Sequence, residues 1–224
     1  MAIAPVEPSH DCPLCPRLEA FRNLWREREP GWFNAPVPTF MPPEGPNGVR
    51  LLIVGLAPGL RGANRTGRPF TGDYAGDLLY STLIRFGLAR GRFLARPDDG
   101  LELVGTAIIN AVRCVPPENK PTPAEITTCR QFLTPALSGL PNVRAVLALG
   151  AIAHQSTVRA FGQRVAAMPF KHGGRYQAGP VALFSSYHCS RYNTNTGVLT
   201  EAMFVNVFSE IADFLENDDP KPRG

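Results

Sequence analysis

The chain has 224 residues, 44% of them hydrophobic, and a formal net charge of +4. This length and apolar content predict one domain over 1–224 with a sizeable core and leave too little chain for two full domains. No apolar run reaches the roughly 18 residues that cross a bilayer, and the N-terminus lacks a basic segment followed by an apolar one. We therefore expect a soluble, cytoplasmic protein that does not bind membranes, and the mild positive charge permits a polyanionic partner.

The first predicted elements are a helix, an irregular connection and a strand. A Cys-x-x-Cys segment occupies 10–30, and a helix is expected within it over Leu18–Arg28. The proline-rich stretch Pro36–Pro46 indicates an irregular connection. Arg50–Leu56 then predicts a strand buried on both faces, because its residues are mostly β-branched and aliphatic.

The rest of the chain alternates helices and strands. The predicted helices are Tyr74–Gly87, Thr122–Gly139, Ala151–Phe161 and Thr200–Leu215, and the predicted strands are Thr106–Val112, Arg144–Gly150 and Val181–Tyr187. Thr122 and Glu125 have the spacing of a capping box, and Asn217–Gly224 is expected to be a frayed tail. The alternation predicts a three-layer α/β/α sandwich with a central, mainly parallel four-stranded sheet, whose ligand site lies at the carboxyl ends of the strands.

The loop after the first predicted strand is the most informative segment. It carries five glycines from Gly55 to Gly72, which let the backbone approach a ligand closely. A phosphate-binding P-loop requires Gly-Lys followed by Ser or Thr, whereas Gly62 precedes Ala63 and Asn64. The glycine spacing also fails the dinucleotide fingerprint. The loop therefore favours a ligand other than a nucleotide cofactor.

Several arginines lie near this candidate pocket. Arg61, Arg65 and Arg68 follow the first predicted strand, and Arg191 lies in the last polar loop. This clustering suits contacts with phosphate groups, and a solvated loop is the alternative interpretation.

Four of the five cysteines form a pattern with two pairs. Cys12 and Cys15 have two residues between them, and Cys114 and Cys129 have fourteen. Cys114 is expected directly after the second predicted strand, so all four can meet at one end of the sheet. Four thiolates suit an iron-sulfur cluster or a structural zinc, and buried packing cysteines are the alternative. Cys189 is interpreted as a packing residue, and disulfides are not expected in the cytoplasm.

Five segments in order resemble the uracil-DNA glycosylase superfamily, and most closely its family 5 (type B), which carries a 4Fe-4S cluster. They are Gly55–Gly59, Gly62–Phe70, Asn110–Cys114, Asn119–Pro123 and His188–Asn193. The resemblance implies a monomeric enzyme that flips uracil out of DNA and excises it, initiating base excision repair. It also implies that the cluster is held by Cys12, Cys15, Cys114 and Cys129.

The resemblance assigns the base-binding residues. Phe70 is expected to stack on the base, Asn110 to read its pairing edge, and His188 to donate a hydrogen bond to the departing base. A core phenylalanine, a turn asparagine and a structural histidine are the respective alternatives. Gly55, Leu56, Ala57 and Gly59 are expected to form the surrounding wall.

Two positions differ from the better-known relatives. Ala57 stands where these have an acidic residue, so Asp73 is the expected group for positioning water or stabilising the cationic sugar, with Asn119 as a second candidate. Asp73 as a simple cap of the next helix is the alternative. Gly59 stands where uracil-only members have a tyrosine, which predicts tolerance of 5-substituted uracils or deaminated purines such as hypoxanthine.

The remaining assignments concern DNA. The expected contacts are Arg61, Asn64, Arg65, Ser190, Arg191 and Tyr192, with Tyr192 at the position of the side chain that wedges into the duplex. The superfamily branch that forms a covalent adduct through a histidine in a basic insertion is not expected, because Thr71–Leu79 runs straight into a helix without a Lys/Arg-rich insert. A non-catalytic DNA-lesion sensor is the alternative function, motivated by Ala57.

Overall fold

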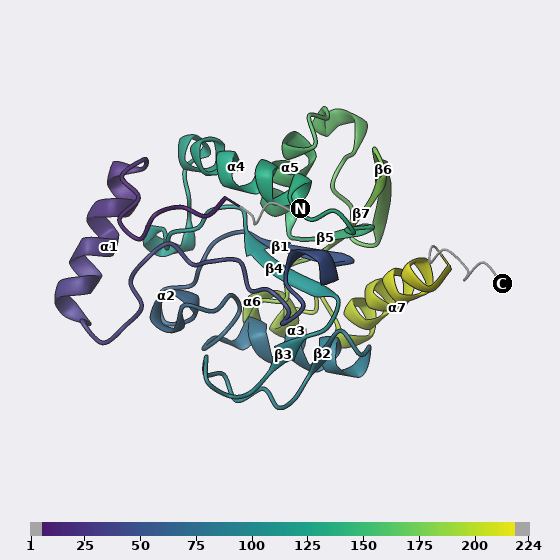
Figure 1. Cartoon of the computed structure of the whole chain (residues 1–224), viewed down its shortest axis with the longest axis horizontal. Coiled ribbons are helices and arrows are strands. Elements are labelled where there is room, and N and C mark those ends of the chain that lie inside the picture. The colour runs from purple at the N-terminus through teal and green to yellow at the C-terminus, as the bar shows by residue number, and fades with distance from the viewer. Residues whose placement is uncertain (1–5, 218–224) are drawn as a thin grey trace.

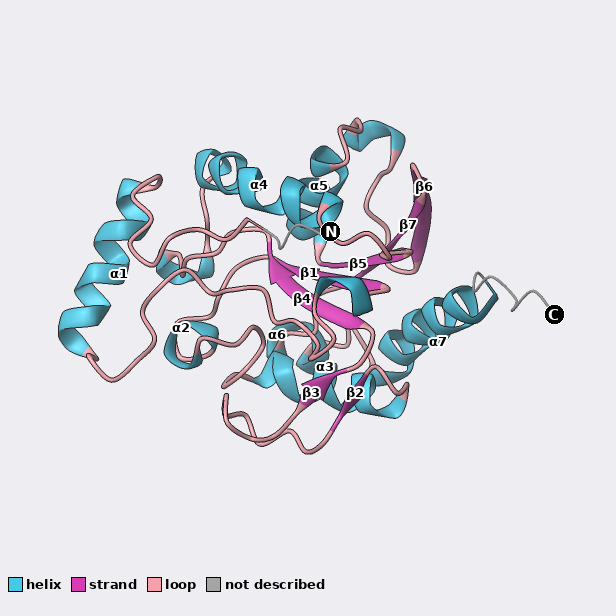
Figure 2. Cartoon of the chain, in the orientation of Figure 1, coloured by secondary structure: helices cyan, strands magenta, loops and turns pink. Residues whose placement is uncertain are grey.

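Five strands form the central sheet of the computed structural model, which describes residues 6–217. Their order is β4, β1, β5, β7, β6 (Figure 2). Their bounds are β1 Leu51–Gly55, β4 Thr106–Asn110, β5 Ala145–Leu149, β6 Gly174–Ala178 and β7 Val181–Ser186. All neighbours pair in parallel except β6, which is antiparallel to β7. The predicted mainly parallel sheet is confirmed, and β6 adds a fifth strand to the four expected.

The missed strand β6 lies at the edge of the sheet. Its sequence, GRYQA, is mostly polar, and its residues alternate between half-buried and exposed until the last one. It therefore lacks the apolar run by which the four buried strands were predicted.

The five predicted helices are confirmed to within two residues at each end. The helices are α1 Pro16–Arg28, α2 Ala63–Thr66, α3 Tyr74–Arg85, α4 Pro123–Ser138, α5 Ala151–Ala160, α6 Arg191–Asn195 and α7 Glu201–Asn217, with 3₁₀ turns η1 Pro46–Gly48, η2 Pro117–Asn119 and η3 Val165–Ala167. A small hairpin, β2 Ala89–Arg90 and β3 Glu102–Leu103, follows α3. The short helices α2 and α6 and this hairpin were not predicted.

Side chains of β1 alternate between the two faces of the sheet, which explains the three layers. Leu51 and Ile53 pack into one core with residues of α3 and α7, while Leu52 and Val54 pack into a second core with residues of α4 and α5. All four are fully buried. Figure 1 shows α4 and α5 on one side of the sheet and α3 and α7 on the other.

The N-terminal helix α1 lies at one end of the molecule, beside the start of α4 (Figure 1). The predicted capping box of α4 is confirmed, since Thr122 and Glu125 bond each other's backbone N–H groups. The Glu125 carboxylate also forms an ion pair with Arg17 of α1, with Nη2 and Oε2 2.8 Å apart. One carboxylate therefore caps α4 and attaches α1 to it.

One boundary prediction is wrong, because β4 ends at Asn110 rather than Val112. Cys114 consequently does not follow the strand directly. The N–H groups of Ala111 and Val112 instead donate to Gly55 O and Leu56 O, both at 2.9 Å, so this segment runs beside the loop after β1. The predicted tail lies outside the described residues beyond Asn217, the last residue of α7. No described helix is long and apolar enough to cross a membrane.

Candidate active site

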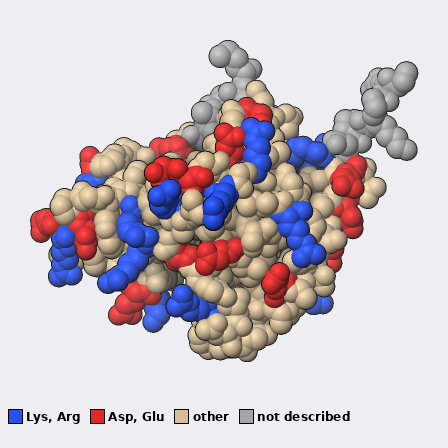
Figure 3. All heavy atoms as spheres, turned by 90° about the horizontal axis from the view of Figure 1, so that it is seen from below, with Lys and Arg blue, Asp and Glu red and all other residues tan. Residues whose placement is uncertain are grey.

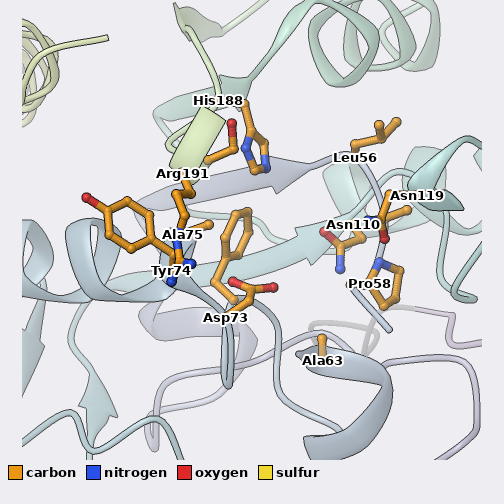
Figure 4. Close-up of a pocket in the computed structure, with 14 residues that line it drawn as sticks. Leu56, Pro58, Ala63, Asp73, Tyr74, Ala75, Asn110, Asn119, His188 and Arg191 are labelled. Carbon is orange, nitrogen blue, oxygen red and sulfur yellow. The ribbon is translucent and has the colours of Figure 1, made fainter. Parts of the chain in front are cut away.

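A cavity of about 550 Å³ lies at the carboxyl ends of β1, β4 and β7 (Figure 4). Ten of its fourteen lining residues come from the ends of these strands, from the segments that follow them, or from α2 and α6, and the other four come from the loop before α3 and from α3 itself. The lining residues are Leu56, Ala57, Pro58, Gly59, Ala63, Phe70, Asp73, Tyr74, Ala75, Asn110, Asn119, His188, Ser190 and Arg191. Ligand sites are expected at this edge of an open parallel sheet.

Glycines make room for the side chains of the cavity. A Cβ on Gly55 would lie 2.4 Å from Asn110 Oδ1 and 2.7 Å from Phe70 Cζ. Gly55 therefore does not line the cavity itself but lies behind two residues that do. Gly55 thus allows side chains to approach the backbone closely, and the predicted close approach of a ligand to the glycine loop stays a prediction.

Phe70 and His188 form a stacked pair in the cavity. Their ring centroids are 5.8 Å apart with an interplanar angle of 29°. Phe70 has a φ of 52°, in the left-handed region that side chains rarely adopt. Its backbone is also pressed against α3, since a Cβ on Gly76 would lie 2.0 Å from Phe70 O. The chain thus holds the ring in place at the cost of backbone strain.

The imidazole of His188 is neutral at physiological pH. Burial lowers its pKa to about 4. Its backbone carbonyl accepts a hydrogen bond from Asn193 Nδ2 at 2.8 Å, which fixes the loop after β7 to α6. A neutral imidazole has one N–H to donate, which is the property expected of this residue.

Asn110 is the last residue of β4 and pairs in register with Gly55 of the adjacent strand β1. Its side chain is nearly buried, at 4% exposed, and points into the cavity (Figure 4). The amide therefore presents a donor and an acceptor from a rigid strand end.

Asp73 occupies the N-cap position of α3 but makes no side-chain capping hydrogen bond. Its carboxylate faces the glycine loop, because a Cβ on Gly59 would lie 2.9 Å, and one on Gly62 2.4 Å, from Asp73 Oδ2. Among residues 6–217, Asp73 Oδ1 has no hydrogen-bond partner. Burial raises the pKa of Asp73, and the backbone N–H groups of Ala75 and Gly76 oppose the shift.

The second candidate for water positioning, Asn119, also lines the cavity. It is exposed and lies in the turn η2, where Glu118 and Asn119 have φ values of 54° and 56°. Leu56 and Ala57 line the same cavity with apolar side chains. Asp73 is therefore the one carboxylate among the lining residues.

The rim of the cavity carries two predicted DNA contacts. Ser190 and Arg191 line it, and the Arg191 guanidinium lies over the Tyr74 ring, 5.2 Å from the ring centroid. Ser190 also caps α6, accepting from Asn193 N at 3.4 Å. Tyr192 lies next to the cavity rather than in it and is 74% exposed, as an intercalating side chain requires.

The arginine-rich loop divides into surface and interior residues. Arg61 and Arg65 are exposed. Asn64, predicted to contact DNA, is fully buried, and its Nδ2 donates to Asn34 Oδ1 at 2.8 Å. That prediction is corrected, because the side chain fastens the loop to the N-terminal segment instead.

Arg68 likewise does not reach a phosphate. It is 6% exposed and its two terminal nitrogens donate to the two carboxylate oxygens of Asp99, each at 2.8 Å. Its guanidinium also lies over the rings of Phe40, Tyr80 and Phe93. This arginine supports the loop from inside.

Four lining residues were not predicted as part of the site: Pro58, Ala63, Tyr74 and Ala75. Tyr74 is the one with a usable sequence signal, since it is an aromatic residue directly after Asp73 at a predicted helix start. In the structure it is half-exposed. The other three contribute backbone and small apolar groups, which leave no chemical signature in a sequence.

Three of the four patterned cysteines pack together behind this pocket, and the fourth, Cys12, lies near them. Cys114 and Cys129 form a buried cluster with Leu18 and Val112, and Cys15 and Ala57 pack against it. Burial is the main cause of the raised pKa of Cys114. Cys12 and Cys15 are close enough to raise this pKa further by electrostatic repulsion. Ala57 thus belongs to both the cavity wall and the cysteine cluster.

Burial raises the pKa of Cys114 to about 11 and that of Cys129 to about 12, so without a bound cation these thiols are protonated. The backbone N–H of Arg113 donates to Cys129 Sγ at 3.2 Å, as is common for metal-bound sulfur. Within residues 6–217 no three Cys, His, Asp or Glu side chains already stand in a metal-holding arrangement. The donor set fits a soft metal centre.

Charged residues on the face in Figure 3 are interspersed, with Lys and Arg beside Asp and Glu. This face has no broad patch of a single sign.

An aromatic ring, an amide, a neutral imidazole and a carboxylate around one cavity define an α/β protein whose pocket suits a flat, polar ring. The family model described as "Uracil DNA glycosylase superfamily" matches residues 42–212. The chain belongs to the uracil-DNA glycosylase superfamily.

Individual relatives agree with this family. A type-5 uracil-DNA glycosylase from Thermus thermophilus is 47% identical over 206 residues, which cover 89% of this chain and 91% of that protein. A type-5 uracil-DNA glycosylase from Pyrobaculum aerophilum is 38% identical over 206 residues, covering 90% and 88%. A type-4 uracil-DNA glycosylase from the same organism is 33% identical over 153 residues, covering 66% and 70%. The similarity to the type-5 proteins thus extends over more of the chain.

Proposed function

We propose that this protein excises uracil from DNA by hydrolysing the N-glycosidic bond, the first step of base excision repair. One observation carries the proposal: Phe70 and Asp73 of one loop, Asn110 and His188, which come from three separate places in the sequence, line a single cavity. Its volume of about 550 Å³ admits a flipped nucleotide. The partner is DNA containing uracil.

The base lies on the Phe70 ring, and Asn110 holds its pairing edge. The Asn110 amide offers a donor and an acceptor, matching the O4 and N3–H of uracil. The strained φ of Phe70, 52°, supports a fixed stacking surface rather than an ordinary core position. The backbone of Leu56, Ala57 and Gly59 encloses the ring.

His188 stabilises the departing base. As the bond between C1′ and the base nitrogen breaks, its electron pair moves onto the base, and the neutral imidazole donates a hydrogen bond to the oxygen that gains charge. A preorganised donor of this kind contributes about 2.7–4 kcal/mol to transition-state stabilisation. The position of His188 beside Phe70, with 5.8 Å between ring centroids, supports this role.

Asp73 orients the attacking water and stabilises the cationic sugar. The water oxygen forms the new bond to C1′, and a carboxylate accepts its proton. Burial raises the pKa of Asp73, which makes the carboxylate a stronger base than an exposed aspartate. Asn119 is the second candidate and acts, if at all, by hydrogen bonding, since an amide does not take up a proton at neutral pH.

Substrates beyond uracil follow from Gly59. Apart from the Asp73 carboxyl group, no described atom outside the adjoining residues lies within 4 Å of a Cβ placed on Gly59. This open wall supports excision of 5-substituted uracils and of deaminated purines such as hypoxanthine.

The DNA backbone contacts Arg61, Arg65, Ser190 and Arg191, and Tyr192 fills the space that the flipped base leaves. The exposure of Arg61, Arg65 and Tyr192 supports these roles. Asn64 is not part of this surface.

The cofactor is a 4Fe-4S cluster held by Cys12, Cys15, Cys114 and Cys129. The packing of Cys15, Cys114 and Cys129 in one cluster, the proximity of Cys12 to Cys114 and the N–H···S bond to Cys129 support a soft metal centre of structural function. When bound, the cluster would supply rigidity at the wall formed by Ala57. We assign it a structural rather than a redox role, because hydrolysis of the glycosidic bond transfers no electrons. Purified protein with about four irons and brown colour is expected, whereas a colourless protein with one zinc would contradict the cluster.

The activity is tested with duplex oligonucleotides that carry a single uracil, or a cytosine at the same position as control. The expected result is an alkali-sensitive site at uracil only, lost in His188→Ala and Asp73→Asn. Tight binding to the uracil duplex without alkali-sensitive breakage would favour a lesion sensor instead.

A cytoplasmic location, a monomeric state and a single domain over 1–224 stay predictions. All five cysteines are free, which suits a reducing compartment. Size-exclusion chromatography with light scattering tests the monomer.

A further inference from the structure

Arg22 of α1 lies buried at the cysteine cluster. It is 1% exposed, and its Nη1 donates to Cys114 Sγ at 3.5 Å. Its Nη2 donates to Cys12 O at 3.2 Å, while Nε has no partner among the described residues. The guanidinium therefore contacts two of the four cysteines, Cys114 at its sulfur and Cys12 at its backbone carbonyl.

No carboxylate within residues 6–217 forms an ion pair with Arg22. A guanidinium keeps its charge under all physiological conditions, and a buried charge without a counter-charge is strongly unfavourable. Helix α1 could place a hydrophobic residue here at lower cost. An anion at the cysteines would remove the penalty.

Arg113 provides a contrast at the same cluster. It is also 1% exposed, but its Nη2 forms an ion pair with the Glu7 carboxylate, and its Nε donates to Val37 O at 2.8 Å. The charge of Arg113 is therefore balanced within the protein. The charge of Arg22 has no such carboxylate partner among the described residues.

We propose that Arg22 is the counter-charge of the cysteine-bound iron-sulfur centre and raises its reduction potential. This inference rests on the proposed cluster. Four thiolate ligands give such a centre a negative charge that grows by one on reduction. A cation and an N–H···S contact beside it stabilise the reduced form more than the oxidised form. Arg22 is accordingly a positioning and tuning residue with no contact to the DNA substrate.

The test compares Arg22→Gln, which removes the charge but keeps hydrogen-bond donors, with Arg22→Lys, which keeps the charge. Arg26→Gln is the matched control, because Arg26 lies one turn further along α1 and its Nη1 pairs with Asp11 near the surface at 2.7 Å. The readouts are iron content, the rate of iron loss to a chelator, and the midpoint potential from a redox titration followed by electron paramagnetic resonance.

Arg22→Gln is expected to shift the potential to more negative values and to lose iron faster, whereas Arg22→Lys and Arg26→Gln stay close to the wild type. A brown Arg22→Gln protein with wild-type potential overturns the inference. Should Arg22→Gln not retain its iron, equal loss from Arg22→Lys overturns it too, since charge would then not be the cause. A colourless wild-type protein that excises uracil overturns the cluster and this inference but leaves the glycosylase proposal standing.

Discussion

Replacing Gly62 by alanine should displace the proposed catalytic carboxylate of Asp73 while leaving Asp73 itself unchanged. A Cβ on Gly62 would lie 2.4 Å from Asp73 Oδ2, 3.0 Å from Cγ and 3.3 Å from Cβ. Ordinary van der Waals contact begins at about 3.4 Å, so the carboxylate oxygen must withdraw by about 1 Å. The φ of Gly62 is −94°, outside the left-handed region that favours glycine.

The expected loss of rate follows from this displacement. A misplacement of about 1 Å at a reacting group costs on the order of 10²-fold, or about 2.7 kcal/mol of transition-state stabilisation. Gly59→Ala should cost less, because its Cβ would lie 2.9 Å from the end of the same carboxylate and 4.0 Å from Cγ. Gly31→Ala is the control, since nothing lies within 4 Å of its Cβ.

The assay is single-turnover excision from a uracil duplex with enzyme in excess, read as alkali-sensitive breakage. Thermal unfolding of each variant separates lost rate from lost stability. A Gly62→Ala protein with the wild-type rate and melting temperature would refute the assignment of Asp73, because its carboxylate could then leave its position without consequence.

Three further results are expected. The pKa of His188 is about 4 in the folded protein against 6.5 for an unperturbed histidine, so the unfolded state binds its proton first. The free energy of unfolding should therefore fall as pH decreases from 6.5 to 4. Urea titrations at several pH values should show a smaller change of unfolding free energy with pH for His188→Gln than for the wild type. The same pH dependence in both proteins would contradict the buried, neutral imidazole. Arg68→Met leaves Asp99, whose side chain is 0% exposed, without its ion-pair partner, and should lower the free energy of unfolding by about 3–5 kcal/mol. A loss below 1 kcal/mol in chemical denaturation would show that Asp99 reaches water. Tyr192→Ala should weaken binding to uracil-containing duplex in fluorescence anisotropy yet leave excision from single strands unchanged, since only a duplex has a stack to fill; equal effects on both substrates would argue against the wedge.

The sequence was sufficient for most of the fold because buried strands and capped helices leave local patterns. The run over Leu51–Val54 predicts a doubly covered strand, and Thr122 with Glu125 predicts the start of α4. Both are confirmed. The edge strand β6 and the short helix α6 lack such patterns, since β6 is mostly polar and α6 has only five residues, too few to show a helical period.

Predictions about single polar residues were less secure. Asn64 and Arg68 look like Arg61 and Arg65 in the sequence, because all four are polar residues of one glycine-rich loop. Asn34 and Asp99, which bond them in the interior, lie about 30 residues away along the chain, and the distances of these hydrogen bonds, each 2.8 Å, appear only in the folded structure.

The sequence by itself determined the family, the order of the layers and most of the residues that line the cavity, since each depends on local runs and motif order. Tertiary structure decided what those residues can do. From the sequence alone, Asp73 fits a helix cap and a catalytic carboxylate equally well. In the folded protein its carboxylate lies beside Gly59 and Gly62, where a Cβ would approach it to 2.9 and 2.4 Å, and near the backbone N–H groups of Ala75 and Gly76. Direction, burial and the nearest atom are properties of contacts between distant segments, which is why no local pattern specifies them.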